Sequence, residues 1–302
     1  MDEIKTINIE KCFPQLLEIP DAPKKLYARG TLPNTDAIFL TVVGSRKYTS
    51  YGKDVCEKII SELSISNLST SDVSRLGIVI ISGLALGIDA IAHRAALKSG
   101  LKTIAIPGSG LNSSVLYPAS NHGLANKIVS AGGALLSEFE PDFRATPYSF
   151  PQRNRIMAGM SRGILVIEAG ERSGTLITAR LATEYNRDVF VVPGSIFSPQ
   201  SRGSHQLLKL GAIPVTCGAD ILEHWGLTPD DNNNNNDNKR KAILRECSDE
   251  EKQIFELLHE PTTKEELMQK LDMPTHNVNI TLSVMEIKGL IVETHGEMRI
   301  NV

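Results

Sequence analysis

Residues 38–63 read IFLTVVGSRKYTSYGKDVCEKIISEL and contain, in order, an apolar run, a short polar turn and a helical stretch. The run Ile38–Val43 is apolar on both faces of an extended strand, which is typical of a strand covered by helices on both sides. Small and polar residues follow at once, and residues 51–63 carry apolar side chains at helical spacing. This stretch therefore predicts one strand–turn–helix unit of a parallel sheet.

The same alternation continues along the chain. Further short apolar runs predict strands at 78–81, 103–106, 134–136, 164–167 and 189–192. Helical stretches lie between them, at residues 90–98, 124–130 and 176–185. Strands that alternate with helices indicate βαβ units. The predicted fold is therefore α/β, with an extended Rossmann-like, doubly wound and mainly parallel sheet.

A polar segment divides the chain. Residues 229–238 read PDDNNNNNDN, which has no apolar side chain to bury, so we expect a flexible linker over 229–242. Before it we expect a Rossmann-like domain at 37–228, with a lead-in at 1–36 packed on it. After it, three helical stretches and a hairpin pattern predict a winged-helix-like domain at 243–302. Thr263 and Glu266 have the spacing of a helix capping box there.

The composition excludes several classes of protein. The chain has 302 residues, of which 41% are hydrophobic and 22% charged, as in ordinary globular domains. It has no apolar run of about 18 residues and no visible secretory signal, so we expect neither a membrane span nor export. The four cysteines form no CxxC pair, which argues against a disulfide framework or a zinc site. We therefore expect a cytoplasmic protein without a metal or a cofactor.

The charge is spread unevenly along the chain. The net charge of −3 excludes a uniformly basic nucleic-acid binder. However, residues 41–226 carry 18 basic and 14 acidic side chains, whereas residues 227–302 carry 9 basic and 15 acidic ones. A site for a polyanion is therefore expected in the Rossmann-like domain.

Small and polar residues gather where the predicted strands end, which is where ligands bind in open parallel sheets. Three such turns follow the first, second and fifth of the predicted strands. Each can contact an anion through backbone N–H groups or an arginine side chain. They contain Gly44, Ser45 and Arg46; Ser82, Gly83, Leu84, Ala85 and Gly87; and Ser173, Gly174 and Thr175. Close packing and helix capping would explain the same residues without a ligand. His93 is expected to be a hydrogen-bonded structural histidine.

A fourth segment, residues 150–159, reads FPQRNRIMAG and places two arginines around an asparagine, ahead of an apolar helix. Arg153, Asn154 and Arg155 are candidates for phosphate contacts, although positions 153 and 155 cannot share one helical face. Phe150 is a candidate for stacking on a base, as aromatic residues do in single-strand binders. A core position would explain Phe150 equally well.

In this order, these motifs resemble the DNA-processing protein A (DprA/Smf) family. The resemblance rests on Gly44-Ser45-Arg46, the 82–89 loop with Ala92-His93, Tyr117-Pro118, Ser137-Glu138, the 150–159 segment and Ser173-Gly174-Thr175-Leu176, and it continues through Pro193-Gly194 and residues 203–208. It covers about residues 13–226. It implies a non-enzymatic, dimeric protein that binds single-stranded DNA, protects incoming strands in natural transformation and helps to load the RecA recombinase. It also implies that Arg46 and the 82–87 loop line a phosphate pocket, with Arg153, Asn154 and Arg155 near it.

Two other functions stay open at this point. Phosphoribohydrolases of a related fold carry a Pro-Gly-Gly-x-Gly-Thr-x-x-Glu motif, whose glutamate is catalytic. Here Gly174-Thr175 is followed after two residues by Thr178, although Glu168 and Glu171 lie nearby in the sequence. The second alternative is a regulator that reads duplex DNA through its winged helix. The acidic charge of that domain favours a contact with protein instead.

Overall fold

The chain forms two compact units, Met1–Asp230 and Asp231–Val302. The structure, a computed structural model, describes residues 3–64, 77–227, 247–258, 262–271, 273–294 and 297–300. The predicted linker at 229–242 lies outside these residues.

A nine-stranded sheet runs through the described part of the first unit. Its spatial order is β1-β2-β6-β5-β4-β3-β7-β8-β9. All neighbouring strands from β6 to β9 in this order are parallel, whereas β1 and β2 pair antiparallel at the β6 edge. The strands are β1 (Lys5–Ile7), β2 (Leu26–Gly30), β3 (Ile38–Val43), β4 (Ile78–Ser82), β5 (Lys102–Ala105), β6 (Ala134–Ser137), β7 (Gly163–Val166), β8 (Asp188–Val191) and β9 (Ile213–Pro214). The predicted mainly parallel sheet is confirmed.

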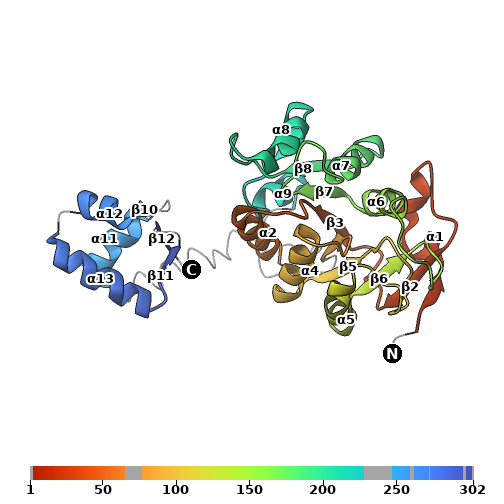
Figure 1. Cartoon of the computed structure of the whole chain (residues 1–302), viewed down its shortest axis with the longest axis horizontal. Helices are drawn as coiled ribbons and strands as arrows, with labels where there is room; N and C mark the ends of the chain where they lie inside the picture. Colours follow the sequence, from red (N-terminus) through yellow and green to blue (C-terminus); the bar gives the residue numbers. More distant parts are fainter. Residues whose placement is uncertain are drawn as a thin grey trace. The chain divides into compact units, whose positions relative to one another are not determined.

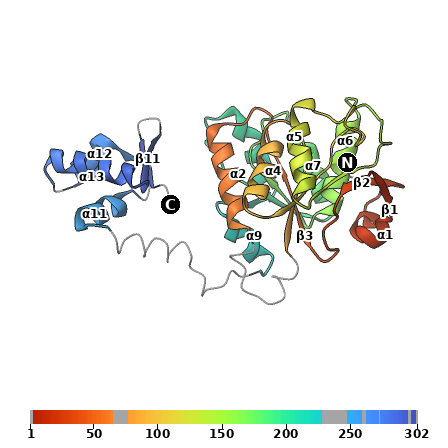
Figure 2. The same ribbon diagram turned by 90° about the horizontal axis from the view of Figure 1, so that it is seen from below.

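Helices cover both faces of this sheet (Figure 1). On one face lie α2 (Ser50–Glu62), α4 (Ile88–Lys98), α5 (His122–Ser130) and α9 (Gly218–His224). Of these, α2, α4 and α5 lie side by side (Figure 2). On the other face lie α1 (Ile9–Cys12), the 3₁₀ helix η1 (Pro14–Glu18), α6 (Ser149–Met160), α7 (Thr175–Glu184) and α8 (Arg202–Lys209). The short helices η3 (Ala119–Asn121) and η4 (Pro199–Ser201) lie in loops.

Strand β3 explains why both faces are apolar in sequence. Its residues Ile38, Leu40 and Val42 pack in the core beneath α2 and α4. On the alternate positions, Phe39 and Val43 pack in the core beneath α6 and α7. Thr41, between them, is also buried, and its hydroxyl donates to the Met157 carbonyl of α6. Because successive side chains of a strand point to opposite faces, a central strand of a doubly wound sheet is buried at every position and is therefore mostly apolar.

The sheet reverses its direction of growth between β3 and β7. From β3 the chain adds β4, β5 and β6 one after another, and then returns to place β7 on the other side of β3. The loops that leave β3 and β7 therefore run to opposite faces and leave a crevice between them. In open α/β sheets, ligands bind at this switch point, outside the carboxyl ends of the strands.

The second unit has its own small core. Three helices, α11 (Asp249–Leu257), α12 (Lys264–Lys270) and α13 (Thr275–Ile287), pack around Ile254, Leu267, Val278 and Leu282. An antiparallel sheet of β10 (Thr262–Thr263), β12 (Glu297–Ile300) and β11 (Ile291–Thr294), in that order, completes it. The capping box of Thr263 and Glu266 is present at the start of α12. Within the described residues, none of the helices is both long and apolar enough to cross a membrane.

Candidate functional site

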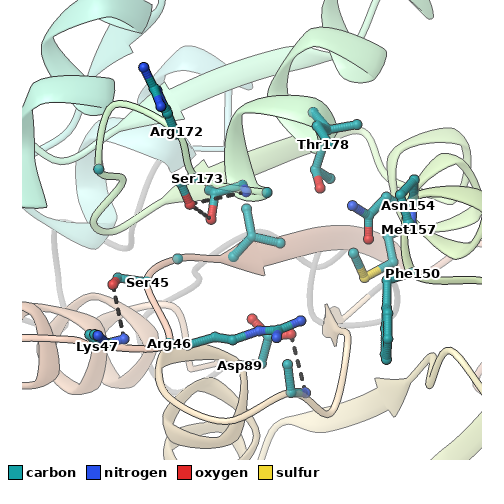
Figure 3. Close-up of a pocket in the computed structure, with 18 of the residues that line it drawn as sticks. Ser45, Arg46, Lys47, Asp89, Phe150, Asn154, Met157, Arg172, Ser173 and Thr178 are labelled. Atoms are coloured by element: carbon teal, nitrogen blue, oxygen red, sulfur yellow. Dashed lines mark hydrogen bonds between the residues drawn. The ribbon is translucent and has the colours of Figure 1, made fainter. Parts of the chain in front are cut away.

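A cavity of about 560 Å³ lies at the switch point. It is bounded by the turn after β3, the loop after β4, helix α6 and the loop between β7 and α7 (Figure 3). Segments that are more than 100 residues apart in sequence, such as Ser45 and Ser173, thus face the same space. The candidate site is therefore a product of the sheet topology.

The walls of this cavity are cationic. Arg46 and Lys47 come from the turn after β3 and Arg172 from the loop after β7, and all three are exposed. Arg153 adds a fourth positive charge from α6 and is only 4% exposed. Asp89 is the only acidic residue among the described residues that line the cavity. Hydroxyl and amide groups of Ser45, Asn154, Ser173 and Gln200 complete a lining that suits an anion.

Arg46 stacks on an aromatic ring at one end of the cavity. Its guanidinium carbon lies 5.6 Å from the centroid of the Phe150 ring. Phe150 in turn lies 5.6 Å from the ring of Tyr117. Phe150 is half-buried, because it also packs against Gly108, where an added Cβ would come within 2.7 Å of its ring. The ring therefore helps to orient Arg46, in a position next to the cavity where a base could stack.

A buried carboxylate supports the loop after β4. The carboxylate of Asp89 accepts hydrogen bonds from the backbone N–H groups of Gly83, at 3.1 Å, and Ala85, at 3.4 Å. Burial raises the pKa of Asp89, whereas the neighbouring Arg153 charge acts to lower it. Burial also lowers the pKa of Arg153 to about 10, opposed by Asp89, so this guanidinium stays charged at neutral pH. An added Cβ on Gly83 would lie 1.6 Å from Arg153 Nη1, so the loop rests directly on the guanidinium.

The loop of residues 82–87 is mostly framework. The buried Ser82 hydroxyl donates to the carbonyl of Val42, and Leu84 is fully buried. Gly87 has a φ of +84°, and a Cβ there would meet the Ser45 carbonyl at 2.4 Å. Because Asp89 already accepts from two N–H groups of this loop, those groups do not point to an outside anion. From this loop, Ala85 lines the main cavity, while Gly83 borders a small neighbouring hollow beside Arg46.

Helix α6 begins earlier than the sequence indicates. The prediction that the two arginines precede the helix is wrong, because α6 starts at Ser149 and includes them. Asn154 lines the cavity together with Arg153. Arg155 does not, because its guanidinium forms an ion pair with Glu138 at the end of β6. The structure therefore brings two of these three predicted residues together with Arg46.

The third predicted turn opens helix α7. Ser173, Gly174 and Thr175 all line the cavity, as do Gly44 and Ser45. The Ser173 hydroxyl accepts a hydrogen bond from the backbone N–H of Thr175, the first residue of α7, at 3.2 Å. Gly174 is exposed, and an added Cβ there would meet nothing within 4 Å. This helix start therefore faces the cavity with a positive helix end.

Among the residues of the cavity that were not site candidates from the sequence, three polar ones are informative. Lys47 is the second cation of the first turn, and Thr178 lies one helical turn into α7. Gln200 comes from η4, far along the chain, and its side-chain oxygen accepts from the Ser45 hydroxyl at 3.0 Å. Lys47 could have been found beside Arg46, whereas the position of Gln200 follows only from β8 lying next to β7.

The two glutamates considered for catalysis lie outside this cavity. The Glu168 carboxylate accepts from the backbone N–H of Thr49 at 2.9 Å and from its hydroxyl at 2.5 Å. Glu171 is exposed and lies 3.8 Å from Arg202. His93 is fully buried, with its Nδ1 2.7 Å from the Thr103 hydroxyl. The described residues contain no cluster of three or more His, Cys, Asp or Glu that could hold a metal ion.

Comparison with known proteins gives the family. Residues 5–226 match the family model described as "DNA recombination-mediator protein A". The chain is 43% identical over 218 residues to protein Smf of Escherichia coli K12, a match that covers 70% of this chain and 55% of that protein. It is also 43% identical over 215 residues to the DNA processing protein DprA of Streptococcus pneumoniae, covering 71% of each chain. The chain thus spans about half the length of the Escherichia coli relative.

Two solved structures share the fold of the first unit. The structure of DNA processing protein A from Streptococcus pneumoniae has a TM-score of 0.64 and 41% identity, covering 73% of this chain and 74% of that one. A structure of DNA processing protein A from Helicobacter pylori, which concerns its single-stranded DNA binding mode, has a TM-score of 0.61 and 30% identity. It covers 74% of this chain and 98% of that one. The chain therefore belongs to the DNA recombination-mediator protein A family, the DprA/Smf family that its motifs resemble.

Proposed function

We propose that this protein is a non-enzymatic recombination mediator, and that the cavity at the switch point binds the backbone of single-stranded DNA. One observation carries the proposal. Three exposed cations and one buried cation face a single cavity from three different loops and helices, with Asp89 as the one opposing charge among its described lining residues. The Helicobacter pylori relative, which binds single-stranded DNA, supports the same function for this chain.

The arrangement favours a strand over a mononucleotide. Arg46 and Lys47 lie on one side of the crevice and Arg172 on the other, so their charges can contact successive phosphates. Contacts of this kind do not depend on base sequence and weaken with salt, because binding releases counterions. The ring of Phe150, held between Arg46 and Tyr117, is a site for stacking at one end of this path.

A titration tests this function. The full chain is mixed with a fluorescently labelled single strand, and anisotropy is measured at several salt concentrations. A plot of the logarithm of the affinity against the logarithm of the salt concentration should be a falling straight line. Each phosphate contact should contribute roughly −0.7 to its slope. Arg46→Glu should weaken binding at least about tenfold and reduce this slope. The control is Lys102→Glu, the same change of charge on an exposed residue at the amino end of β5.

Equal affinity in Arg46→Glu and the unchanged protein would contradict the proposed cavity. If Lys102→Glu weakens binding as much as Arg46→Glu does, then net charge alone, rather than the cavity, determines the affinity. A preference for duplex DNA over the single strand would contradict the proposed ligand.

A non-enzymatic function is supported by the position of Glu168. Both of its oxygens accept hydrogen bonds from Thr49, and they hold the first turn of α2. A carboxylate occupied in this way lacks the freedom to act on a nucleotide in the cavity. Incubation with nucleoside 5′-monophosphates should therefore yield no free base. Release of base that disappears in Arg46→Ala would favour the phosphoribohydrolase instead.

We also propose that the protein acts as a homodimer, protects incoming strands in the cytoplasm and helps to load RecA. The family resemblance supports these steps. An exposed apolar surface supports pairing, since Leu210 is 83% exposed beside a hollow of about 790 Å³ that Leu207 and Ile213 also line. The four cysteines form no disulfide, as is usual in a reducing compartment. Light scattering after size exclusion should give the mass of two chains, and Leu210→Glu should give the mass of one.

A further inference from the structure

The loop that follows β8 presents two large apolar side chains to solvent. Ile196 is 76% exposed and Phe197 is 89% exposed, so Phe197 contributes almost nothing to the core of this unit. An exposed aromatic ring of this kind is free to stack on a nucleobase. The function proposed above does not use this loop.

The loop is held in place at both ends. At its start, the Tyr51 hydroxyl donates to the Pro193 carbonyl at 2.7 Å, and His205 Nε2 lies 3.0 Å from the Gly194 carbonyl. Within the loop, the Phe197 N–H donates to the Ser195 hydroxyl at 3.3 Å. At its end, the Ser198 hydroxyl accepts from the Gln200 N–H and caps η4. The backbone is therefore fixed, and Phe197 projects from an anchored turn.

This loop continues the same edge of the sheet as the cationic cavity. The cavity lies at the carboxyl ends of β3 and β7, and the loop leaves the carboxyl end of β8, which lies next to β7. Gln200, at the end of the loop, lines the cavity and hydrogen-bonds to Ser45 within it. A single strand of DNA that leaves the cavity past Gln200 would therefore reach this loop next.

Ser195 and Ser198, which lie on either side of Phe197 in the sequence of this loop, line a second hollow of about 520 Å³. The ring of Tyr51 and Pro193 supply apolar surface, and Ser195 and Ser198 supply hydroxyl groups. None of the described residues that line it is a lysine or an arginine, and its one carboxylate, Glu168, is held by Thr49. This hollow therefore has nothing to attract a phosphate, but it offers the apolar surface and the hydrogen-bonding groups that an uncharged nucleobase requires.

We propose that this hollow and Phe197 form a second nucleotide subsite, which binds a base of the strand whose phosphates occupy the cationic cavity. The inference rests on the proposed function and extends it. Phosphates bind at Arg46, Lys47 and Arg172, and the next base along the strand lies against Tyr51 or stacks on Phe197. The strand path then extends along the carboxyl edge from β4 to β8.

The test separates this subsite from the cavity by its salt dependence. In the full chain, Phe197→Ala should weaken binding of a single strand of about 20 nucleotides roughly tenfold, because stacking on one aromatic residue is lost. The slope of affinity against salt should not change, since no phosphate contact is removed. Phe197→Trp should restore the affinity. Leu17→Ala is the control, because Leu17 is also an exposed apolar residue. It lies on η1, which contacts the carboxyl-terminal end of α6, and therefore at the amino end of β7 rather than at the carboxyl edge of the sheet.

A strand that lacks bases provides the second measurement. On an abasic strand of the same length, Phe197→Ala and the unchanged protein should bind equally well. An unchanged affinity of Phe197→Ala for the normal strand would overturn the subsite, as would an equal loss on the abasic strand. A loss that coincides with a change in molecular mass would assign Phe197 to a protein interface and would also overturn it. If the unchanged protein fails to bind any single strand, the proposed function itself is wrong.

Discussion

At the scale of single residues, the four arginines and lysines of the cavity differ in what they can do. Arg46, Lys47 and Arg172 are exposed and can meet a ligand directly. Arg153 is buried beside Asp89, and its guanidinium supports the loop that Asp89 ties together. One of the four positive charges of the cavity, that of Arg153, therefore supports the structure of the site. Gly83 is the residue of the loop that lies directly on this guanidinium.

Gly83→Ala should weaken both folding and DNA binding. Its Cβ would lie 1.6 Å from Arg153 Nη1, so the buried guanidinium or the loop must move. We expect a loss of about 1–3 kcal/mol in the free energy of unfolding, typical of an overpacked site, together with weaker binding of single strands. Urea unfolding and the anisotropy titration measure the two effects. Gly123→Ala is the matched control, because an added Cβ there meets nothing within 4 Å in α5, and it should leave both values near those of the unchanged protein.

His93 should make the protein sensitive to acid. Burial lowers its pKa to about 3, and its Nδ1 bonds to the Thr103 hydroxyl, which itself donates to the Ile80 carbonyl. In the unfolded chain the pKa is about 6.5, so the unfolded state binds the extra proton first as the pH falls. Stability is therefore full above pH 6.5 and should drop by about 1.4 kcal/mol for each pH unit from there toward 3.

Urea unfolding at a series of pH values checks this expectation, with His93→Gln for comparison. The variant lacks the titrating ring, so its curve should be flatter than that of the unchanged protein over this interval. Parallel curves would mean that another group causes the acid sensitivity.

At the scale of helices and strands, the sequence predicted most of the first unit. The six predicted strands overlap β3 to β8 with ends within one residue, and the helices at 51–63 and 90–98 begin or end within two residues of α2 and α4. Central parallel strands and the helices between them have strong apolar patterns, which is why they could be predicted. The short antiparallel strands β1 and β2 have no such pattern and were not identified as strands.

The start of α6 shows why part of the site could not be predicted. Pro151 precedes the arginines and lies in the first turn of α6. A proline is tolerated there because the N–H groups of a first turn have no partner within the helix. This difference moves Arg153 from a loop to a buried helical position and turns Arg155 toward Glu138. Which arginine faces a ligand depends on helix phase and neighbouring strands, and local sequence contains neither.

The capping box of α12 yields a prediction for the second unit. The Thr263 hydroxyl accepts from the Glu266 N–H at 3.3 Å, and the Glu266 carboxylate accepts from the Thr263 N–H at 3.4 Å. Thr263→Ala removes one of these bonds and should lower the stability of this unit by about 1 kcal/mol. Thermal unfolding of the full chain should show the change only in the transition of the second unit. The affinity for single strands should stay the same, and a loss of affinity would connect this unit to DNA binding.

At the scale of the whole molecule, charge and packing divide the chain at the same place. The apolar cores of the first unit contain residues up to 227, and the core of the second begins at residue 254. The net charge of −3 thus averages a first unit whose residues 41–226 are basic overall with a second part that is clearly acidic. The overall charge therefore says little about the ligand, because the cavity carries its own local charge.

A chain truncated after residue 227 should bind single strands at least as tightly as the full chain. The first unit keeps its whole core, and the truncation removes 9 basic and 15 acidic side chains, which relieves repulsion between DNA and the acidic part. This repulsion is screened over about 10 Å at 0.1 M salt, so any gain in affinity should be largest at low salt and disappear as salt is added. Anisotropy titrations of both chains across salt measure it. If the truncated chain folds but binds more weakly at every salt concentration, then residues 228–302 contact the strand, and the cavity at the switch point does not account for binding alone.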